Sequence, residues 1–344
     1  MLWPTFNGLS AMSPRLLLAA VLLLLPAAQA QEPGEGPPPE QVAAHVAHTQ
    51  RLAAALAREG GARELALAAL LRQADAQQAD PEATSEAPDA QAQAWLRASA
   101  AKAGADVIAN QLLIAAAAKA DPIRLEAARR WQAAEPDNLA PLLHAGLTID
   151  ALLAQARGAT RADTGMYPAV RWIAEAWRRH PPGAAEQAAM AGGEAFDLDE
   201  AAAMSAMAVW AAAAMPDYAA LVEGCSAQML RAQPARRGGC LHVARLLADG
   251  ATSIADEHAG LAMLRALAGT AAERDEVDAR QRAMDWRMLQ WGRLAQQQPR
   301  GGAGQFARLL RDPRIRSEQQ LVERVLAEGG VAADPPPGWQ APRR

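Results

Sequence analysis

This sequence predicts an all-α fold, and three features carry the prediction. Alanine makes up about a quarter of the 344 residues, and alanine has the highest helix propensity. Residues that favour strands are scarce, with only two tyrosines and three phenylalanines. Apolar stretches are separated by short segments that contain glycine and proline, which end helices. We therefore expect antiparallel helix pairs that form an irregular α-solenoid or a multi-helix bundle.

The first thirty residues, 1–30, predict a secretory signal peptide. Arg15 is the only charged residue among them, and the apolar run 16–25 follows it directly. Pro26 and the small-residue triplet ending at Ala30 are typical of a cleavage site. The apolar run is about half the length that a membrane-spanning helix needs, so cleavage is favoured. An uncleaved N-terminal anchor is the alternative.

Composition divides the rest of the chain into three parts. Residues 31–40, QEPGEGPPPE, have nothing to bury and are expected to form a disordered spacer. An all-helical domain is expected at 41–330, with a candidate subdivision near 158–165. The proline-rich segment 331–344 is expected to be a flexible tail.

Start and stop signals place the helices of the first half. Asp121 is an N-cap followed by proline at the first helical position, and Gly60-Gly61 separates the first two helices. On such signals, helices are expected at about 41–59, 62–78, 91–103, 106–119 and 122–134, shortly after Asn138, and at 148–156.

Periodicity places the helices of the second half. Val170, Ile173 and Trp177 repeat on one face of a helix expected at 166–179. Residues 199–215 begin with acids and are apolar afterwards, which predicts a buried central helix too short to cross a membrane. Further helices are expected at about 184–191, 216–231, 236–248, 253–268, 273–297, 304–311 and 317–328.

Cys225 and Cys240 are the only cysteines of the chain. In an exported protein an even pair of cysteines predicts a disulfide. The two residues are expected on neighbouring helices at a similar height above the break at Gln233-Pro234, so one bridge would clamp a helical hairpin. A redox-active pair is the alternative, although the C-x-x-C spacing that lowers a thiol pKa is lacking.

Charge and motifs exclude several classes of function. The net charge is −4 at pH 7, which argues against nucleic acid and against an anionic membrane surface as the main partner. The chain has no G-x-S-x-G motif, and its glycine-rich stretches do not precede Lys-Ser or Lys-Thr. We therefore expect no catalytic residue and no cofactor.

Histidines and acids are each explained more simply by structure than by chemistry. His45 and His48 are spaced to share a metal only if a third ligand arrives from elsewhere, so we expect no metal and two solvated histidines on an exposed face. Acids such as Asp197 and Asp199 stand where helices begin and are expected to cap them. Two carboxylates facing each other across a cleft, as glycosidases use, would require a fold that brings them together.

Tryptophan is unusually frequent, with nine residues, and several lie beside arginine. Large aromatic side chains fill the gaps that alanine-rich helices leave, so most are expected in the core. Tryptophan with arginine is also typical of binding hot spots. The candidate partner-binding residues are Met284, Trp286, Met288, Trp291, Trp131 and Trp177. The face with Met284, Met288 and Trp291 is the best single candidate.

Two stretches resemble helical repeats. Residues 126–143, EAARRWQAAEPDNLAPLL, resemble the second helix of a tetratricopeptide unit running into the next, with Ala127, Trp131 and Ala134 on one face and a break at Pro136. The aromatic lies closer to the proline than in that family's pattern.

Residues 244–268, ARLLADGATSIADEHAGLAMLRALA, resemble a Sel1-like unit, in which a helix ending at Asp249-Gly250 is followed by a linker and a second helix. Each resemblance covers one unit, and no second copy recurs at a fixed period. The resemblance implies a helical repeat protein of the bacterial periplasm. Proteins of the Sel1-like family also join helix pairs by disulfides, which suits Cys225 and Cys240.

These observations predict a periplasmic or secreted, non-enzymatic protein that binds another envelope protein or a peptide. Nucleic acid is not an expected partner, and neither is stable membrane insertion after signal cleavage. The alternatives are a helical enzyme that acts on envelope polymers through carboxylates, and an anchored structural protein of the envelope.

Overall fold

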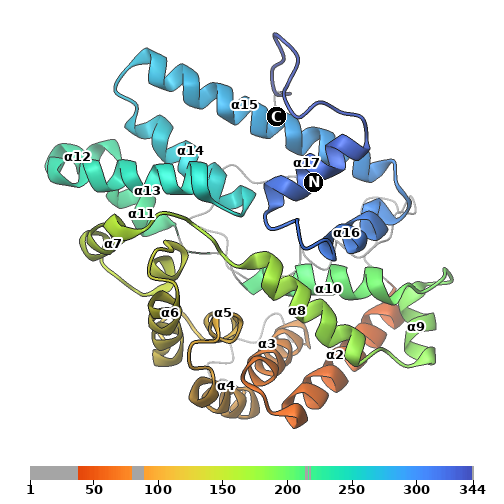
Figure 1. The fold of residues 1–344 in the computed structure, drawn as a ribbon. Helices are drawn as coiled ribbons and strands as arrows, with labels where there is room; N and C mark the ends of the chain where they lie inside the picture. Colours follow the sequence, from red (N-terminus) through yellow and green to blue (C-terminus); the bar gives the residue numbers. More distant parts are fainter. Residues whose placement is uncertain (1–37, 80–88, 214–215, 217, 343–344) are drawn as a thin grey trace.

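The computed structural model describes residues 38–79, 89–213, 216 and 218–342, and this part of the chain is all-α (Figure 1). It contains sixteen α-helices and four short 3-10 helices. Within these ranges there is no strand, only isolated backbone bridges of Asn138 with Arg161 and of Ala162 with Ala251. The predicted fold class is confirmed. The predicted signal peptide lies outside the described residues.

Helices near the N-terminus pack against their sequence neighbours. They are α2 (Pro39–Glu59), α3 (Ala62–Ala79), α4 (Ala90–Lys102), α5 (Val107–Ala116) and α6 (Pro122–Ala134). Gly60 ends α2 in the left-handed region at φ 70°, which favours glycine, and so allows the short turn into α3. Helix α2 begins at Pro39, so the predicted spacer was drawn two residues too long: Pro39 suits the first helical position.

The middle of the chain returns to this first group. It forms η2 (Ala140–His144), α7 (Ile149–Gln155), η3 (Ala156–Gly158), α8 (Met166–Arg179), α9 (Ala184–Ala191) and α10 (Leu198–Ala213). Helix α9 packs on α2, and α10 packs along α8. Asp197 accepts hydrogen bonds from the backbone N–H groups of Asp199 and Glu200, which confirms the predicted acidic cap of α10.

The last part of the chain adds a further layer. It forms α11 (Ala219–Gly224), α12 (Ala227–Ala232), η4 (Pro234–Arg236), α13 (Arg237–Gly250), α14 (Ile254–Leu267), α15 (Ala271–Gln296), η5 (Pro299–Gly302), α16 (Ala303–Leu310) and α17 (Glu318–Glu328). Helices α13, α14 and α15 pack in sequence, α17 packs on α15, and α16 reaches back to α10. This return contact departs from a solenoid, whose units contact only their neighbours in the chain.

Three hydrophobic clusters form the core. The first joins α2–α6 with α8, α10 and α16, and the second joins α7 with α11–α14. The third lies between α14, α15 and α17. Alanine allows close helix approach, and Gly260 of α14 allows the closest, because a Cβ there would stand 2.7 Å from the carbonyl carbon of Leu247 in α13.

A buried polar segment, residues 161–165, runs between these clusters. The Asn138 side chain is fully buried and makes four hydrogen bonds, two of which hold the segment at Asp163. Its Nδ2 donates to Asp163 O and Glu135 Oε2, and its Oδ1 accepts from the N–H groups of Asp163 and Ala140. Within the candidate subdivision near 158–165, Gly158 and Thr160 are exposed, whereas residues 161–165 form this hydrogen-bonded and partly buried crossing.

The same segment ties in the start of α14 and of α17. Thr252 Oγ1 donates to Asp163 Oδ1 at 3.0 Å and accepts from Thr164 N–H at 3.2 Å. Thr252 O accepts from Glu318 N–H, and Glu318 Oε2 accepts from Ile254 N–H at 2.7 Å. We call residues 161–165, Asn138, Thr252 and Glu318 the polar junction.

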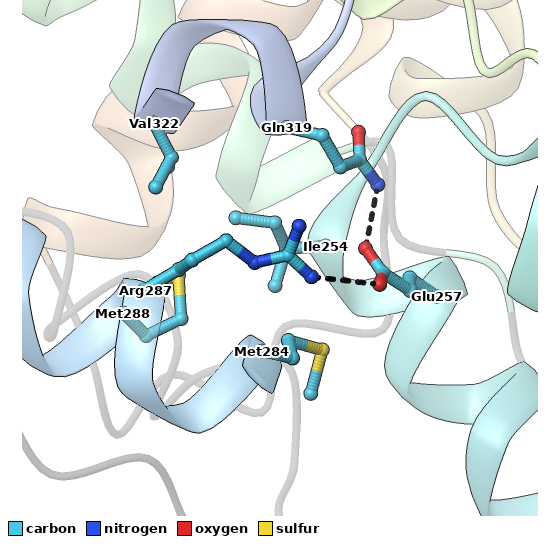
Figure 2. Close-up of a pocket in the computed structure, with 7 residues that line it drawn as sticks. All are labelled: Ile254, Glu257, Met284, Arg287, Met288, Gln319 and Val322. Atoms are coloured by element: carbon cyan, nitrogen blue, oxygen red, sulfur yellow. Dashed lines mark hydrogen bonds and ion pairs between the residues drawn. The ribbon is translucent and has the colours of Figure 1, made fainter. Parts of the chain in front are cut away.

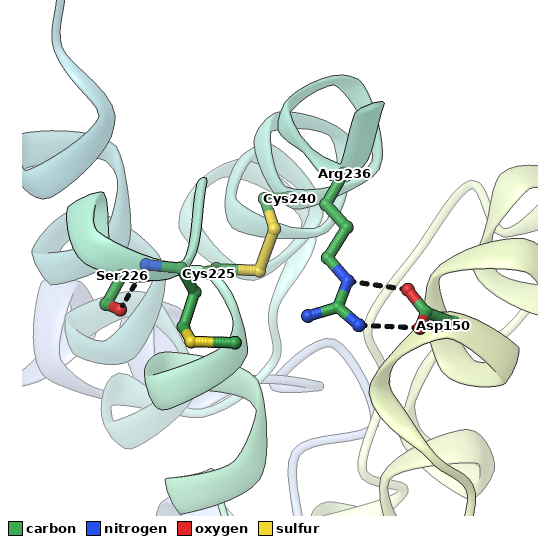
Figure 3. Close-up of a disulfide and its surroundings, with 6 residues drawn as sticks. Asp150, Cys225, Ser226, Arg236 and Cys240 are labelled. Atoms are coloured by element: carbon green, nitrogen blue, oxygen red, sulfur yellow. Dashed lines mark hydrogen bonds and ion pairs between the residues drawn. A yellow bond between two sulfur atoms is a disulfide. The ribbon is translucent and has the colours of Figure 1, made fainter. Parts of the chain in front are cut away.

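The predicted disulfide between Cys225 and Cys240 is present (Figure 3). The predicted single helix at 216–231 was wrong, because the chain breaks at Cys225 and Ser226, whose hydroxyl caps α12 by accepting from Met229 N–H. The bridge therefore joins the end of α11 to the first turn of α13. Beside it, Arg236 forms a bidentate ion pair with Asp150, which attaches this corner to α7.

Removal of the disulfide should destabilise the protein. The bridge closes a loop of 15 residues, so the double variant Cys225→Ser with Cys240→Ser should lose about 3 kcal/mol of unfolding free energy. Urea denaturation of the variant and of the oxidised and reduced wild type measures the loss. Equal midpoints for the oxidised and reduced wild type would show that the bridge does not stabilise the fold.

Two glycines inside helices should respond to alanine in opposite ways. Gly260→Ala should lower the unfolding free energy, because its Cβ would collide with the α13 backbone. Gly292→Ala in α15 meets nothing within 4 Å and should raise the unfolding free energy by up to about 1 kcal/mol through helix propensity. Thermal melts of the two variants give the comparison, and a stabilised Gly260→Ala would contradict the close packing of α13 and α14.

Candidate functional site

Helix α15 carries the face that the sequence favoured, and its start is fixed locally. Thr270 and Glu273 form a capping box: the Thr270 hydroxyl accepts from Glu273 N–H at 3.2 Å, and Glu273 Oε2 accepts from Thr270 N–H at 3.0 Å. Met284 and Met288, one turn apart, face α14 and α17, whereas Trp286 between them points to a different side of the helix. Met284 and Met288 therefore lie on one face of α15, and Trp286 lies on another.

A small pocket lies between α14, α15 and α17 (Figure 2). The space in it that a water-sized sphere can occupy is about 10 Å³, roughly enough for one water molecule. Its lining residues are Ile254, Glu257, Met284, Arg287, Met288, Gln319 and Val322. This volume is far below that of small-molecule sites, which starts at about 300 Å³. The pocket has no room for a cofactor, and a partner's side chain enters it only if the Met284 and Met288 side chains move aside.

The polar groups of this pocket are held in place by one another. Arg287 Nη2 lies 3.4 Å from Glu257 Oε1, and the two side chains are 22% and 12% exposed. Gln319 Nε2 donates to Glu257 Oε2 at 3.0 Å (Figure 2). The Gln319 Oε1 atom is buried and has no partner among the described residues, so it can accept one further hydrogen bond. The site offers flexible apolar surface from two methionines beside a fixed ion pair.

The other face of α15 meets the C-terminal segment. Trp286 Nε1 donates to Ala332 O at 2.9 Å, and the Trp339 ring meets the Trp286 ring edge-on at 5.3 Å. Val331 packs against the third hydrophobic cluster. Composition predicted a flexible tail, but it did not reveal these contacts.

Two of the predicted partner-binding tryptophans are core residues. Trp131 is 2% exposed and donates to Glu135, and Trp177 is 4% exposed and packs against the His48 ring. Neither presents a surface to a partner, so the core-packing interpretation is correct for both. Trp291 is half-buried and packs between the first and third hydrophobic clusters.

The histidines of the HVAH motif are not on an exposed face. His48 is 1% exposed, and burial, with the nearby Arg51 charge, lowers its pKa to about 4. The expectation of a solvated His48 was wrong because α2 turns this residue towards Trp177 of α8. Burial also lowers the pKa of His45. No group of three or more His, Cys, Asp or Glu side chains within the described ranges is arranged to hold a metal ion.

Two acids lie at the polar junction, next to the pocket: Asp256 is 2% exposed, and Glu318 is half-buried. Burial, and then the charges of Glu318 and Asp163, raise the pKa of Asp256 to about 8. Burial also raises the pKa of Glu318. Both carboxyls bond to the start of α14, because Asp256 Oδ2 accepts from the Ser253 hydroxyl and Glu318 Oε2 accepts from Ile254 N–H. Neither carboxyl lines the pocket.

Sequence reasoning missed the residues that complete the site. Glu257, Arg287 and Gln319 come from three helices, and no spacing in the chain announces that they meet. The buried acids left a local signal, since Ser253 precedes Asp256 by three residues and Ser317 precedes Glu318. The two serines predict helix caps, but they do not predict that the acids lie inside the protein.

Comparison with known proteins finds no family model, no curated protein and no solved structure that matches this chain. No helix within the described ranges is long and apolar enough to cross a membrane. The site is therefore interpreted from its own geometry.

Stability should fall as pH rises through the range in which Asp256 stays protonated only in the folded state. Its pKa is about 8 folded and about 4 unfolded, so the folded state binds more protons between these values. The unfolding free energy should decrease by up to about 1.4 kcal/mol per pH unit across this window and level off above it. Chemical denaturation at a series of pH values measures the slope.

Asp256→Asn should flatten this slope and stabilise the protein at high pH, while Glu318 retains part of the dependence. The matched control is Glu276→Gln, which removes the same charge from an exposed site on α15 and should leave the slope unchanged. A wild-type slope that survives Asp256→Asn in full would contradict the assignment.

Proposed function

We propose that this chain is an exported, non-enzymatic protein that binds a peptide or another protein of the bacterial envelope through α15 and the helices beside it. The observation that supports this most directly is the pocket between α14, α15 and α17. Its methionines can adapt to an apolar side chain, and Arg287 with Gln319 can bind polar backbone groups beside that side chain. One apolar residue of a longer partner can anchor there once the two flexible methionine side chains shift to widen the pocket.

The exported location has independent support. The pattern of residues 1–30 is typical of a signal peptide, and disulfides such as Cys225–Cys240 persist in oxidising compartments. The resemblance of residues 126–143 and 244–268 to helical repeats supports protein binding, because such repeats use helix faces to bind proteins.

The alternative function, a helical enzyme that acts on envelope polymers through carboxylates, receives less support. The Glu318 charge acts on Asp256, but the Asp256 carboxyl accepts from the Ser253 hydroxyl and the Glu318 carboxyl accepts from Ile254 N–H, both at the start of α14. A glycosidase needs its acids at the wall of a cleft that the substrate enters. The acid that does line the pocket, Glu257, is already paired with Arg287 and Gln319.

Site-specific crosslinking in the native envelope tests this function. A photoreactive side chain at Met288 should crosslink a distinct partner, whereas the same group at Val222, an exposed apolar residue remote from the pocket, should not. Arg287→Ala should reduce the Met288 crosslink severalfold, because it removes the donor beside the apolar pocket.

The folding of each variant is checked by its circular dichroism spectrum. Equal crosslinking from positions 288 and 222, or none from 288 in folded protein, would contradict binding at this site.

A further inference from the structure

The C-terminal segment occupies the Trp286 face of α15 through a short set of contacts. The indole N–H of Trp286 donates to the backbone carbonyl of Ala332, and Trp339 packs edge-on against the Trp286 ring. Between Ala332 and Trp339 the chain reads Ala-Asp-Pro-Pro-Pro-Gly. An indole N–H that binds a carbonyl beside a run of prolines is the chemistry by which aromatic surfaces bind extended proline-rich segments.

The conformation of this segment is set by its own sequence. Trp339 N–H donates to Pro336 O at 3.1 Å, and Gly338 has φ +78°. Pro337 and Gly338 therefore occupy the central positions of a turn of the kind that prefers proline followed by glycine. The turn directs Trp339 back onto Trp286, and proline limits the freedom of the segment before it docks. A preorganised segment of this kind loses little entropy on binding.

The docked segment is nevertheless held weakly. Of residues 332–342, only Pro335 and Trp339 are even half-buried. Beyond Val331, which packs against the third hydrophobic cluster, the attachment depends on one aromatic pair and one hydrogen bond, and each changes an equilibrium by about tenfold. A segment held by so few contacts opens often enough for a competing segment to take its place.

We propose that the Trp286 face of α15 is a recognition site for a proline-rich segment of another polypeptide, and that the chain's own tail, residues 331–342, is its resident competitor. The proposal rests on the proposed function and specifies its partner. The partner supplies a backbone carbonyl for the Trp286 indole and an aromatic or proline ring for its face. The tail lowers the apparent affinity by the fraction of molecules in which the face is covered.

Binding of a labelled tail peptide to the full-length protein tests the proposal. The probe is a fluorescein-labelled peptide of sequence VAADPPPGWQAPRR, and fluorescence anisotropy reports its affinity. Trp339→Ala should release the tail and strengthen peptide binding about tenfold over wild type, because one aromatic pair is lost. Gln340→Ala is the matched control, since Gln340 is an exposed neighbour in the same tail, and it should bind as wild type does.

The recognition residue is tested in the Trp339→Ala background. Adding Trp286→Phe, which keeps a ring but removes the N–H donor, should weaken peptide binding about tenfold, and Trp286→Ala should abolish it. A peptide of the same composition in scrambled order should bind at least tenfold more weakly than the tail sequence. Thermal melts confirm that each variant is folded.

Several outcomes would overturn the proposal. They are undetectable peptide binding at millimolar concentration, equal binding to wild type and to Trp339→Ala, and binding that survives Trp286→Ala. Dimerisation of the wild type through this face would also overturn it by making the occupant a second copy. If these results occur while the Met288 crosslink persists, the proline-rich partner is rejected and the proposed function stands. If the Met288 crosslink fails while the tail peptide binds as described, only the pocket assignment fails.

Discussion

The polar junction is the constraint on which the arrangement of the helices depends. A chain of hydrogen bonds runs from Asn138 through Asp163 and Thr252 to Glu318, and it passes between the three hydrophobic clusters. Buried polar groups are costly unless they are paired, so this route leaves few alternative positions for the segments it joins. Hydrophobic contact between alanine-rich helices is less selective, because many small side chains fit in several registers. The polar junction supplies the specificity that alanine lacks.

The polar junction also fixes the geometry of the candidate site. Glu318 accepts from Ile254 N–H, so the first turn of α17 is fixed to the first turn of α14. Gln319 is the next residue of α17 and Glu257 lies one turn into α14, which brings their side chains within hydrogen-bond distance. Helix α15 then closes the pocket with Arg287. The same buried acids that orient these helices also make their stability depend on pH.

The sequence predicted helix bounds that depend on local signals, and it missed features that depend on contacts between helices. The bounds of α6 and α8 follow from an N-cap before Pro122 and from a strong apolar period, and both signals lie within the helices themselves. The break at Ser226 was missed because its capping hydroxyl competes with an otherwise continuous helical pattern. The burial of His48 and Trp131 and the meeting of Arg287 with Glu257 depend on which helix packs on which. Only the disulfide, a long-range contact, was predictable, because two cysteines allow one pairing.

The two faces of α15 differ in how firmly they are occupied, and this difference determines how a partner would bind to each of them. On the pocket face, Met284 is nearly buried and Arg287 is paired, so a partner there adds to an existing arrangement. On the Trp286 face, an occupant is already present and is held by two contacts. A partner must displace the tail from this face, so its apparent affinity depends on how much more tightly it binds the face than the tail does. A tail that binds more tightly lowers the apparent affinity of every partner by the same factor, and the proline–glycine turn before Trp339 is the element that positions the competing ring.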